Sequence, residues 1–218
     1  VATPPPPTGT SSGNYLKEVA FCLDGALQAV YSLLRENAAQ LAAEDGIYRC
    51  MSLRTTDEAS DWFLSNEQVF AGENLRKTDF SNMYNEMSMD RVIESVTWCI
   101  DKAFSFLEQK YGCDQFSTVR DGRRYVGLST AEYDDDRLNK ARIKEMLGRV
   151  VRGSLIKHNG VFHLQTAGIA IGGHASRSIA DLACVGIEWR HIESKRSTSP
   201  GAPRIQVLRK VRGRLLYA

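Results

Sequence analysis

Asp79 is the residue whose type and position are best suited to chemistry. It lies near the end of a short stretch, 75–80 (LRKTDF), that predicts a strand, and Tyr84 follows five residues later. A carboxylate on a rigid strand end suits metal-assisted phosphoryl transfer, because divalent ions must be held while they bridge a nucleotide's phosphates. The aromatic ring at Tyr84 would wall a sugar pocket. Taken alone, a strand-end aspartate is more often a turn or capping residue. A catalytic role for Asp79 therefore needs support from a second segment.

The glycine-rich segment 159–188 (NGVFHLQTAGIAIGGHASRSIADLACVGIE) is that second segment. It opens with Asn159 and Gly160 between two apolar runs, which predicts a hairpin because both turn residues tolerate positive φ. A loop punctuated by Gly168, Gly172 and Gly173 follows, and glycine lets backbone approach a ligand where a Cβ would collide. After the loop, small and apolar residues recur at helical spacing: Ile179, Ala180, Ala183, Cys184 and Ile187. The order hairpin, glycine loop, helix therefore predicts a loop that faces a ligand.

The elements that must position these residues are helices and short strands. Apolar spacing predicts helices over 15–43 and 90–111, ended by Gly46 and Gly112, and a third helix capped by the acidic run 134–136. The stretches 47–53 and 75–80 are predicted strands. Because strands and helices do not alternate strictly, we expect an α+β fold, with a small, mainly antiparallel sheet backed by helices.

Composition narrows the class of protein without naming a function. The 218 residues are 43% hydrophobic and 25% charged, which suits one soluble domain or two small ones. No apolar run approaches about 18 residues, so no membrane span is expected. The five cysteines are widely spaced, odd in number and form no CxxC pair, which argues against a zinc site or a disulfide framework and favours a reducing compartment.

The net charge of the whole chain is only +2, but positive charge is concentrated in the C-terminal stretch. From Ser194 to Ala218 it holds seven basic residues and no acid: Lys195, Arg196, Arg204, Arg209, Lys210, Arg212 and Arg214. This pattern predicts either a solvated loop and strand face or a phosphate-binding surface.

The two segments together resemble reverse transcriptases of the Penelope-like and telomerase-like group. DFSNMYNEMSMDRVIESV (79–96) resembles motif A of that group, and NGVFHLQTAGIAIGGHASRSIADL (159–182) resembles its motif B, in the same order. The motif B positions that match are Asn159, Gly160, Gln165, Gly168, Ala170, Gly172 and Ser176. The resemblance covers roughly residues 12–218 and implies a polymerase palm-type antiparallel sheet with part of the helical fingers. It also implies that the chain is a fragment of an RNA-directed DNA polymerase of a mobile element.

The resemblance assigns roles at the matched positions. Asp79 would bind both catalytic ions, Mg²⁺ or Mn²⁺, together with the backbone carbonyl of Phe80, and Tyr84 would be the gate that selects deoxynucleotides. The residues expected to bind the nucleotide are Gln165, Gly168, Ile171, Gly172 and Gly173, and those expected to bind the template–primer are His174, Lys195, Arg196, Arg209 and Arg212. The implied reaction is attack of a primer 3′-OH on the α-phosphate of an incoming dNTP.

The same resemblance divides the chain and places it in the cell. Residues 1–14 would be an extended Pro-rich lead-in, 15–74 the helical region that connects fingers and palm, and 75–218 the palm, with motif A at 75–90 and motif B at 159–188. The expected location is intracellular and nuclear. Template type, priming mode and oligomeric state are left open.

Motif C, the Y-x-D-D hairpin that supplies the remaining metal-binding carboxylates, should follow the motif B helix. The stretch 215–218 (LLYA) predicts the first strand of that hairpin, so the chain would stop one residue before the first of the two aspartates. The Y-x-D-D match at 133–136 lies between the two motifs and predicts a helix cap instead. Because one carboxylate cannot hold two metal ions, the 218-residue chain is expected to be inactive.

Two other interpretations stay open. Motif B departs from the family pattern at His163, Ile171, Gly173, His174 and Arg177, and with the basic stretch these departures favour a degenerate polymerase-like domain that only binds nucleic acid. The chain would instead be an unrelated α+β domain with chance matches if Asp79 and Gly172 lie far apart.

Overall fold

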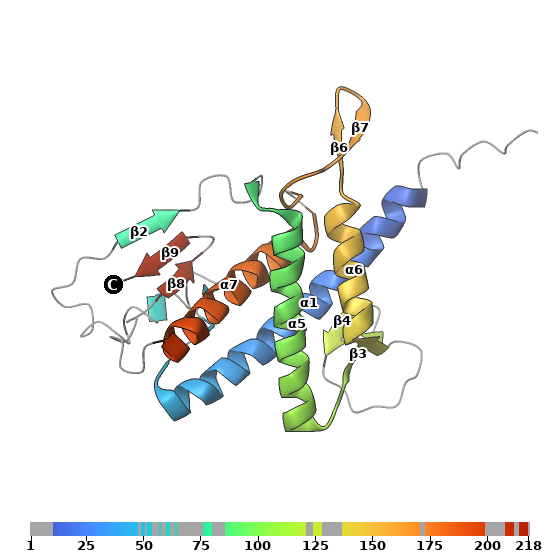
Figure 1. The fold of residues 1–218 in the computed structure, drawn as a ribbon. Coiled ribbons are helices and arrows are strands. Elements are labelled where there is room, and N and C mark those ends of the chain that lie inside the picture. Colours follow the sequence, from blue (N-terminus) through green and yellow to red (C-terminus); the bar gives the residue numbers. More distant parts are fainter. Residues whose placement is uncertain are drawn as a thin grey trace, which may run out of the picture.

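The computed structural model describes residues 11–47, 49–50, 52–53, 57, 60–61, 64, 76–79, 86–120, 124–127, 137–170, 173–198, 208–211 and 214–217. Within this part of the chain, four long helices form the frame: α1 (Ser11–Asp45), α5 (Met89–Tyr111), α6 (Lys140–Arg152) and α7 (Ser176–Thr198). Helix α5 contacts each of the other three, and α1 also packs against α6 and α7 (Figure 1). No helix in the described ranges is both long and apolar enough to cross a membrane.

Helix α5 forms where the apolar spacing predicted it. Its buried positions include Val92, Val96, Ile100 and Leu107, one stripe of a 3.6-residue period. The helix ends at Gly112, which adopts φ 64° and donates its amide to the Glu108 carbonyl at 2.9 Å. A residue with a Cβ would be strained in this left-handed conformation, so glycine marks the end.

The buried faces of the four helices share one hydrophobic core, joined by Phe116, Leu138 and Ile169 from the segments between them. Trp189 on α7 is fully buried and meets Trp98 on α5 edge to face, with ring centroids 6.0 Å apart. Burying a side chain of this size stabilises a fold by roughly 1.5–3 kcal/mol or more. The aromatic pair is therefore one of the contacts that hold α5 against α7.

Helix α6 begins later than the acidic run 134–136 predicted. The short strand β5 (Arg137–Asn139) comes first, and Asn139 is the N-cap, accepting the amide of Arg142 on its side-chain oxygen at 2.8 Å. The prediction that the acidic run caps this helix is wrong, because the capping position lies three residues beyond it. Residues 134–136 are themselves outside the described residues.

The strands that the structure describes form three separate sheets. The largest contains β1 (Ser52–Leu53), β8 (Leu208–Val211), β9 (Arg214–Tyr217) and β2 (Arg76–Asp79), in that order, with β1 parallel to β8 and the other pairs antiparallel. Another consists of β4 (Arg124–Gly127), β3 (Gln115–Arg120) and β5, all antiparallel. The fold is α+β and mainly antiparallel, as the sequence predicted.

The third sheet is the hairpin of β6 (Leu155–His158) and β7 (Val161–Leu164). Its turn residues Asn159 and Gly160 adopt φ 48° and 81°, which confirms the hairpin predicted from this pair. The hairpin projects from the end of α6, away from the helical core (Figure 1).

One strand prediction is wrong. The stretch 215–218 was expected to be the first strand of a hairpin that continues past the last residue. Instead, β9 is the second strand of the β8–β9 hairpin, and it pairs with β2 on its other side. Asp79 is the register partner of Arg214, whereas Tyr217 pairs with Arg76 at the opposite end of β2. Strand β9 therefore runs away from Asp79.

Candidate nucleic-acid interface

The segment after Asp79 and the glycine loop are joined by a backbone hydrogen bond. The amide of Gly168 donates to the carbonyl of Met87 at 2.9 Å, eight residues beyond Asp79 in the chain. Gly168 adopts φ 78°, a conformation in which a Cβ would be strained, and Met87 packs against the core. The two stretches that the sequence singled out therefore meet next to the start of α5.

Gln165 anchors the start of the glycine loop, three residues before Gly168. Its amide donates to the Ser154 carbonyl at 2.9 Å, and its side-chain Nε2 donates to the Ala167 carbonyl at 2.7 Å. The remaining atom, Oε1, is buried and has no hydrogen-bond partner within the described part of the chain. A buried acceptor left without a partner costs about 1–3 kcal/mol. Such an atom calls for an explanation, and a donor group on a ligand would supply one.

The loop ends in a tight connection to α7. The Ser176 hydroxyl donates to the Ala170 carbonyl, and the Ser176 amide donates to the Gly173 carbonyl at 3.2 Å. A Cβ added to Gly173 would lie 2.7 Å from the Ser176 Oγ, so any larger residue would displace that hydroxyl. Glycine at 173 thus has a packing reason that is independent of any ligand.

A cavity of about 380 Å³ lies beside this connection, between α1 and the start of α7. Asp24 on α1 accepts from the Ser178 hydroxyl at 2.5 Å and from Gln28 Nε2 at 2.8 Å. His174 is exposed at the rim, and its ring meets Phe21 edge to face with centroids 5.8 Å apart. His174, one of the residues expected to contact nucleic acid, therefore adjoins a hollow surface.

The remaining predicted site residues fall into two groups. Lys195 is exposed near the end of α7, Arg196 follows it in the same helix, and Arg209 lies in β8. The others lie outside the described residues, so their predicted roles stay predictions: Phe80, Tyr84, Ile171, Gly172 and Arg212.

The strand that pairs with the Asp79 strand supplies no further carboxylate. Two ions need several carboxylates held together. The neighbouring strand instead brings Arg214 opposite Asp79, and Leu208 to Tyr217 contains no acidic residue. Across the ranges that the structure describes, no group of three His, Cys, Asp or Glu side chains could hold a metal ion.

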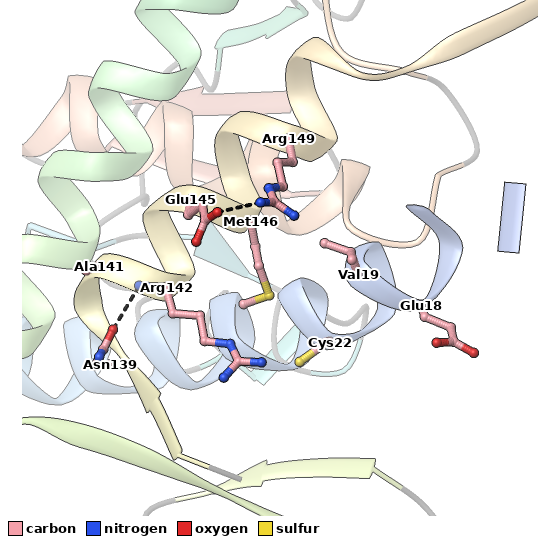
Figure 2. Close-up of a pocket in the computed structure, with 9 residues that line it drawn as sticks. All are labelled: Glu18, Val19, Cys22, Asn139, Ala141, Arg142, Glu145, Met146 and Arg149. Atoms are coloured by element: carbon pink, nitrogen blue, oxygen red, sulfur yellow. Dashed lines mark hydrogen bonds and ion pairs between the residues drawn. The ribbon is translucent and has the colours of Figure 1, made fainter. Parts of the chain in front are cut away.

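A larger cavity, about 660 Å³, lies between α1 and α6 and was not predicted (Figure 2). Its charged residues are balanced: Arg149 pairs with Glu145 at 2.6 Å, and Glu18 and Arg142 come from opposite walls. Figure 2 shows Met146 reaching from α6 toward Cys22 on α1. None of the predicted site residues that the structure describes lines this cavity, and we assign it no ligand.

Sequence reasoning missed Met87 and Ser154, whose backbone carbonyls accept the amides of Gly168 and Gln165, respectively. A backbone carbonyl acceptor cannot be predicted from residue type, because every residue has a backbone carbonyl. The usable signal is indirect, since a positive-φ glycine such as Gly168 often has its amide engaged.

Comparison with solved structures shows that the chain has a telomerase-like fold. The chain is similar to telomerase from Candida tropicalis in complex with a fragment of telomeric RNA, with a TM-score of 0.51 and 13% identity over 97% of this chain and 31% of that one. It is also similar to apo telomerase from the same organism, with a TM-score of 0.51 and 16% identity over 88% of this chain and 30% of that one. The chain thus spans about a third of the length of these telomerases.

No protein-family model matches the chain, and no curated protein matches its sequence. The structural likeness is therefore a likeness of fold. A Penelope-like origin rests on the motif resemblance alone.

Proposed function

We propose that the chain is a reverse-transcriptase-like domain that binds a nucleic acid template–primer without itself transferring nucleotides. The observation that carries the proposal is the hydrogen bond from Gly168 to Met87, which joins the segment after Asp79 to the glycine loop. Its setting in a fold similar to telomerase supports nucleic acid as the ligand class. One of the two telomerase structures contains an RNA fragment.

In this proposal the glycine loop supports a base pair, and Gln165 Oε1 accepts a hydrogen bond from it. The exposed His174 and Lys195 contact the backbone phosphates, with Arg196 and Arg209 adding positive charge. Because cations that neutralise phosphates release counterions, the affinity falls steeply as the salt concentration rises.

The enzymatic alternative is an RNA-directed DNA polymerase of a mobile element. Asp79 and the carbonyl of Phe80 would then hold Mg²⁺ or Mn²⁺, and Tyr84 would select the dNTP. The arginine opposite Asp79, where a second carboxylate would be needed, favours the binding domain. The mobile-element origin and the nuclear location follow from the resemblance alone and stay predictions.

Binding is tested by fluorescence anisotropy with a labelled RNA–DNA hybrid, comparing Gly168→Ala with Gly112→Ala. Both glycines have positive φ, 78° and 64°, so alanine strains each by about 1–2 kcal/mol. Gly168→Ala is expected to weaken binding, because a loop that relaxes to relieve the strain leaves the position set by the Gly168–Met87 hydrogen bond. Gly112→Ala, at the far end of α5, should leave the affinity unchanged. Equal losses, or no binding by the wild-type chain, would contradict the proposal.

Catalysis is tested by primer extension with the 218-residue chain in Mg²⁺ and in Mn²⁺. No extension is expected. Robust extension that is abolished by Asp79→Ala would overturn the binding proposal in favour of the enzymatic alternative.

A further inference from the structure

The β8–β9 hairpin brings positive charge to the strand end that carries Asp79. Of the ten residues from Leu208 to Tyr217, four are basic and none is acidic: Arg209, Lys210, Arg212 and Arg214. The hairpin follows α7 in the chain and pairs directly with β2. It therefore lies where a two-metal site built on Asp79 would need further carboxylates.

The register makes the charge relationship specific. Arg214 is the partner of Asp79 in the β2–β9 ladder, and residues directly opposite each other in neighbouring strands are the unit of interaction in a sheet. Strand β2 itself adds Arg76 and Lys77. Asp79 is the sole acid in β2, β8 and β9. Because residues alternate between the two faces of a sheet, the register places Arg214, Lys77 and Arg209 on the face of Asp79, and Arg76 and Lys210 on the opposite face.

This charge arrangement disfavours a divalent cation and favours a polyanion. A cation approaching Asp79 would meet the repulsion of Arg214 and its neighbours, whereas a phosphate group would be attracted by them. The phosphodiester backbone of a nucleic acid presents such charges at regular spacing, and lysine and arginine are the residues that neutralise it.

We infer that the surface formed by β2, β8 and β9 binds the phosphodiester backbone directly, with no divalent ion between the protein and the phosphates. In this arrangement Asp79 is a negative charge that limits the affinity. The inference rests on the proposed function and names the contact surface for the same ligand. It reverses the role of Asp79: a metal-binding aspartate strengthens the complex, whereas this one weakens it.

The test is a titration of the full 218-residue chain against a labelled RNA–DNA hybrid, at several salt concentrations, with and without EDTA. Chelation is expected to leave the affinity unchanged, and added Mg²⁺ to lower it by competing for the phosphates. Arg209→Gln and Arg214→Gln should each weaken binding and reduce the slope of log affinity against log salt by about 0.7–0.9. Asp79→Asn should tighten binding about two- to fivefold, as expected for one partly screened charge.

Two matched variants control for charge elsewhere. Arg142→Gln on α6 and Asp114→Asn after α5 remove the same charges from exposed positions, and both should leave the affinity unchanged. Arg214→Lys keeps the charge and should keep most of the binding, which a purely structural role of Arg214 would not predict. Circular dichroism of each variant shows that the fold is retained.

Each contrary outcome has a distinct meaning. Weaker binding by Asp79→Asn, or a requirement for Mg²⁺, would overturn the inference and favour a metal site. Binding that matches the controls in all the hairpin variants would overturn the inference while leaving the proposed function intact. Absence of any nucleic acid binding by the wild-type chain would overturn both.

Discussion

Ser95 on α5 donates its hydroxyl to the carbonyl of Ala183 on α7 at 2.7 Å, and the two helices are close enough there that a side chain at Gly186 has no room. A Cβ on Gly186 would lie 2.6 Å from the Ser95 Oγ and 2.7 Å from the Ser95 carbonyl oxygen. The nearby Cys99 thiol donates to the Leu182 carbonyl at 3.3 Å. This contact fixes the helix after Asp79 against the helix after the glycine loop.

Gly186→Ala is expected to destabilise the protein by about 1–3 kcal/mol, because the added methyl group overpacks the α5–α7 contact. The measurement is urea unfolding followed by circular dichroism. Gly148→Ala is the matched control: Gly148 is also a helix glycine, on α6, and nothing lies within 4 Å of its Cβ position. That change should raise stability by about 0.4–1 kcal/mol. A gain in both variants would contradict the packing argument.

Gln165→Met separates binding from stability. The change loses the hydrogen bond to Ala167 but also removes the unsatisfied Oε1, so the free energy of unfolding should stay within about 1 kcal/mol of wild type. Affinity for the RNA–DNA hybrid should fall, because the acceptor is lost. Gln109→Met, at an exposed position of α5, should change neither quantity. A large loss of stability without loss of affinity would assign Gln165 a structural role.

Cys99 should resist alkylation in the folded protein. Burial raises the pKa of its thiol well above the ordinary range, and the thiolate is the reactive form. With iodoacetamide at about pH 8, peptide mass spectrometry should show the half-buried Cys113 modified well before Cys99. The difference should disappear in urea. Rapid modification of Cys99 under native conditions would show that the α5–α7 contact opens readily.

The ion pair between Glu36 on α1 and Lys110 on α5 should make stability depend on acid pH. The hydrogen bond from Lys110 holds the pKa of the Glu36 carboxyl below its ordinary value of 4.5, with Tyr111 adding a second bond at 3.1 Å. A lowered pKa contributes stability that is present above the unfolded value and is lost as the pH falls through the folded one. The pair is exposed, so the effect should be small.

Thermal unfolding of wild type and Glu36→Gln checks this prediction. The wild-type protein should have the higher Tm at about pH 7, and the gap should close as the pH falls below 4.5 and through the lowered pKa of the folded-state carboxyl. A gap that persists in acid would mean that Glu36 acts through packing instead of charge.

Local patterns in the sequence predicted local structure well. The bounds of α5, the end of α1 at Gly46 and the turn at Asn159 and Gly160 depend on apolar spacing and on positive-φ preference within a few residues. The cap of α6 was missed because a run of three aspartates is a stronger capping signal than one asparagine. The short strand β5 follows the aspartates and ends at Asn139, so the helix begins only after Asn139.

The site was less predictable because its contacts are nonlocal. Pairing of β9 with β2 joins residues more than 130 positions apart, and nothing in the stretch 215–218 indicates which strand of a hairpin it forms. The bond from Gly168 to Met87 likewise uses backbone atoms that every residue possesses. Residue types suggested which segments matter, but only the register showed that Asp79 faces an arginine.

The order of strands in the largest sheet has a consequence for folding. Ser52 pairs with Lys210, so this sheet closes a loop of more than 150 residues, whereas the hairpin β6–β7 closes over a two-residue turn. Long loops form late, because their closure entropy must be offset by structure that already exists. The pairing that places Arg214 opposite Asp79 is therefore expected to form after the helices and the β6–β7 hairpin.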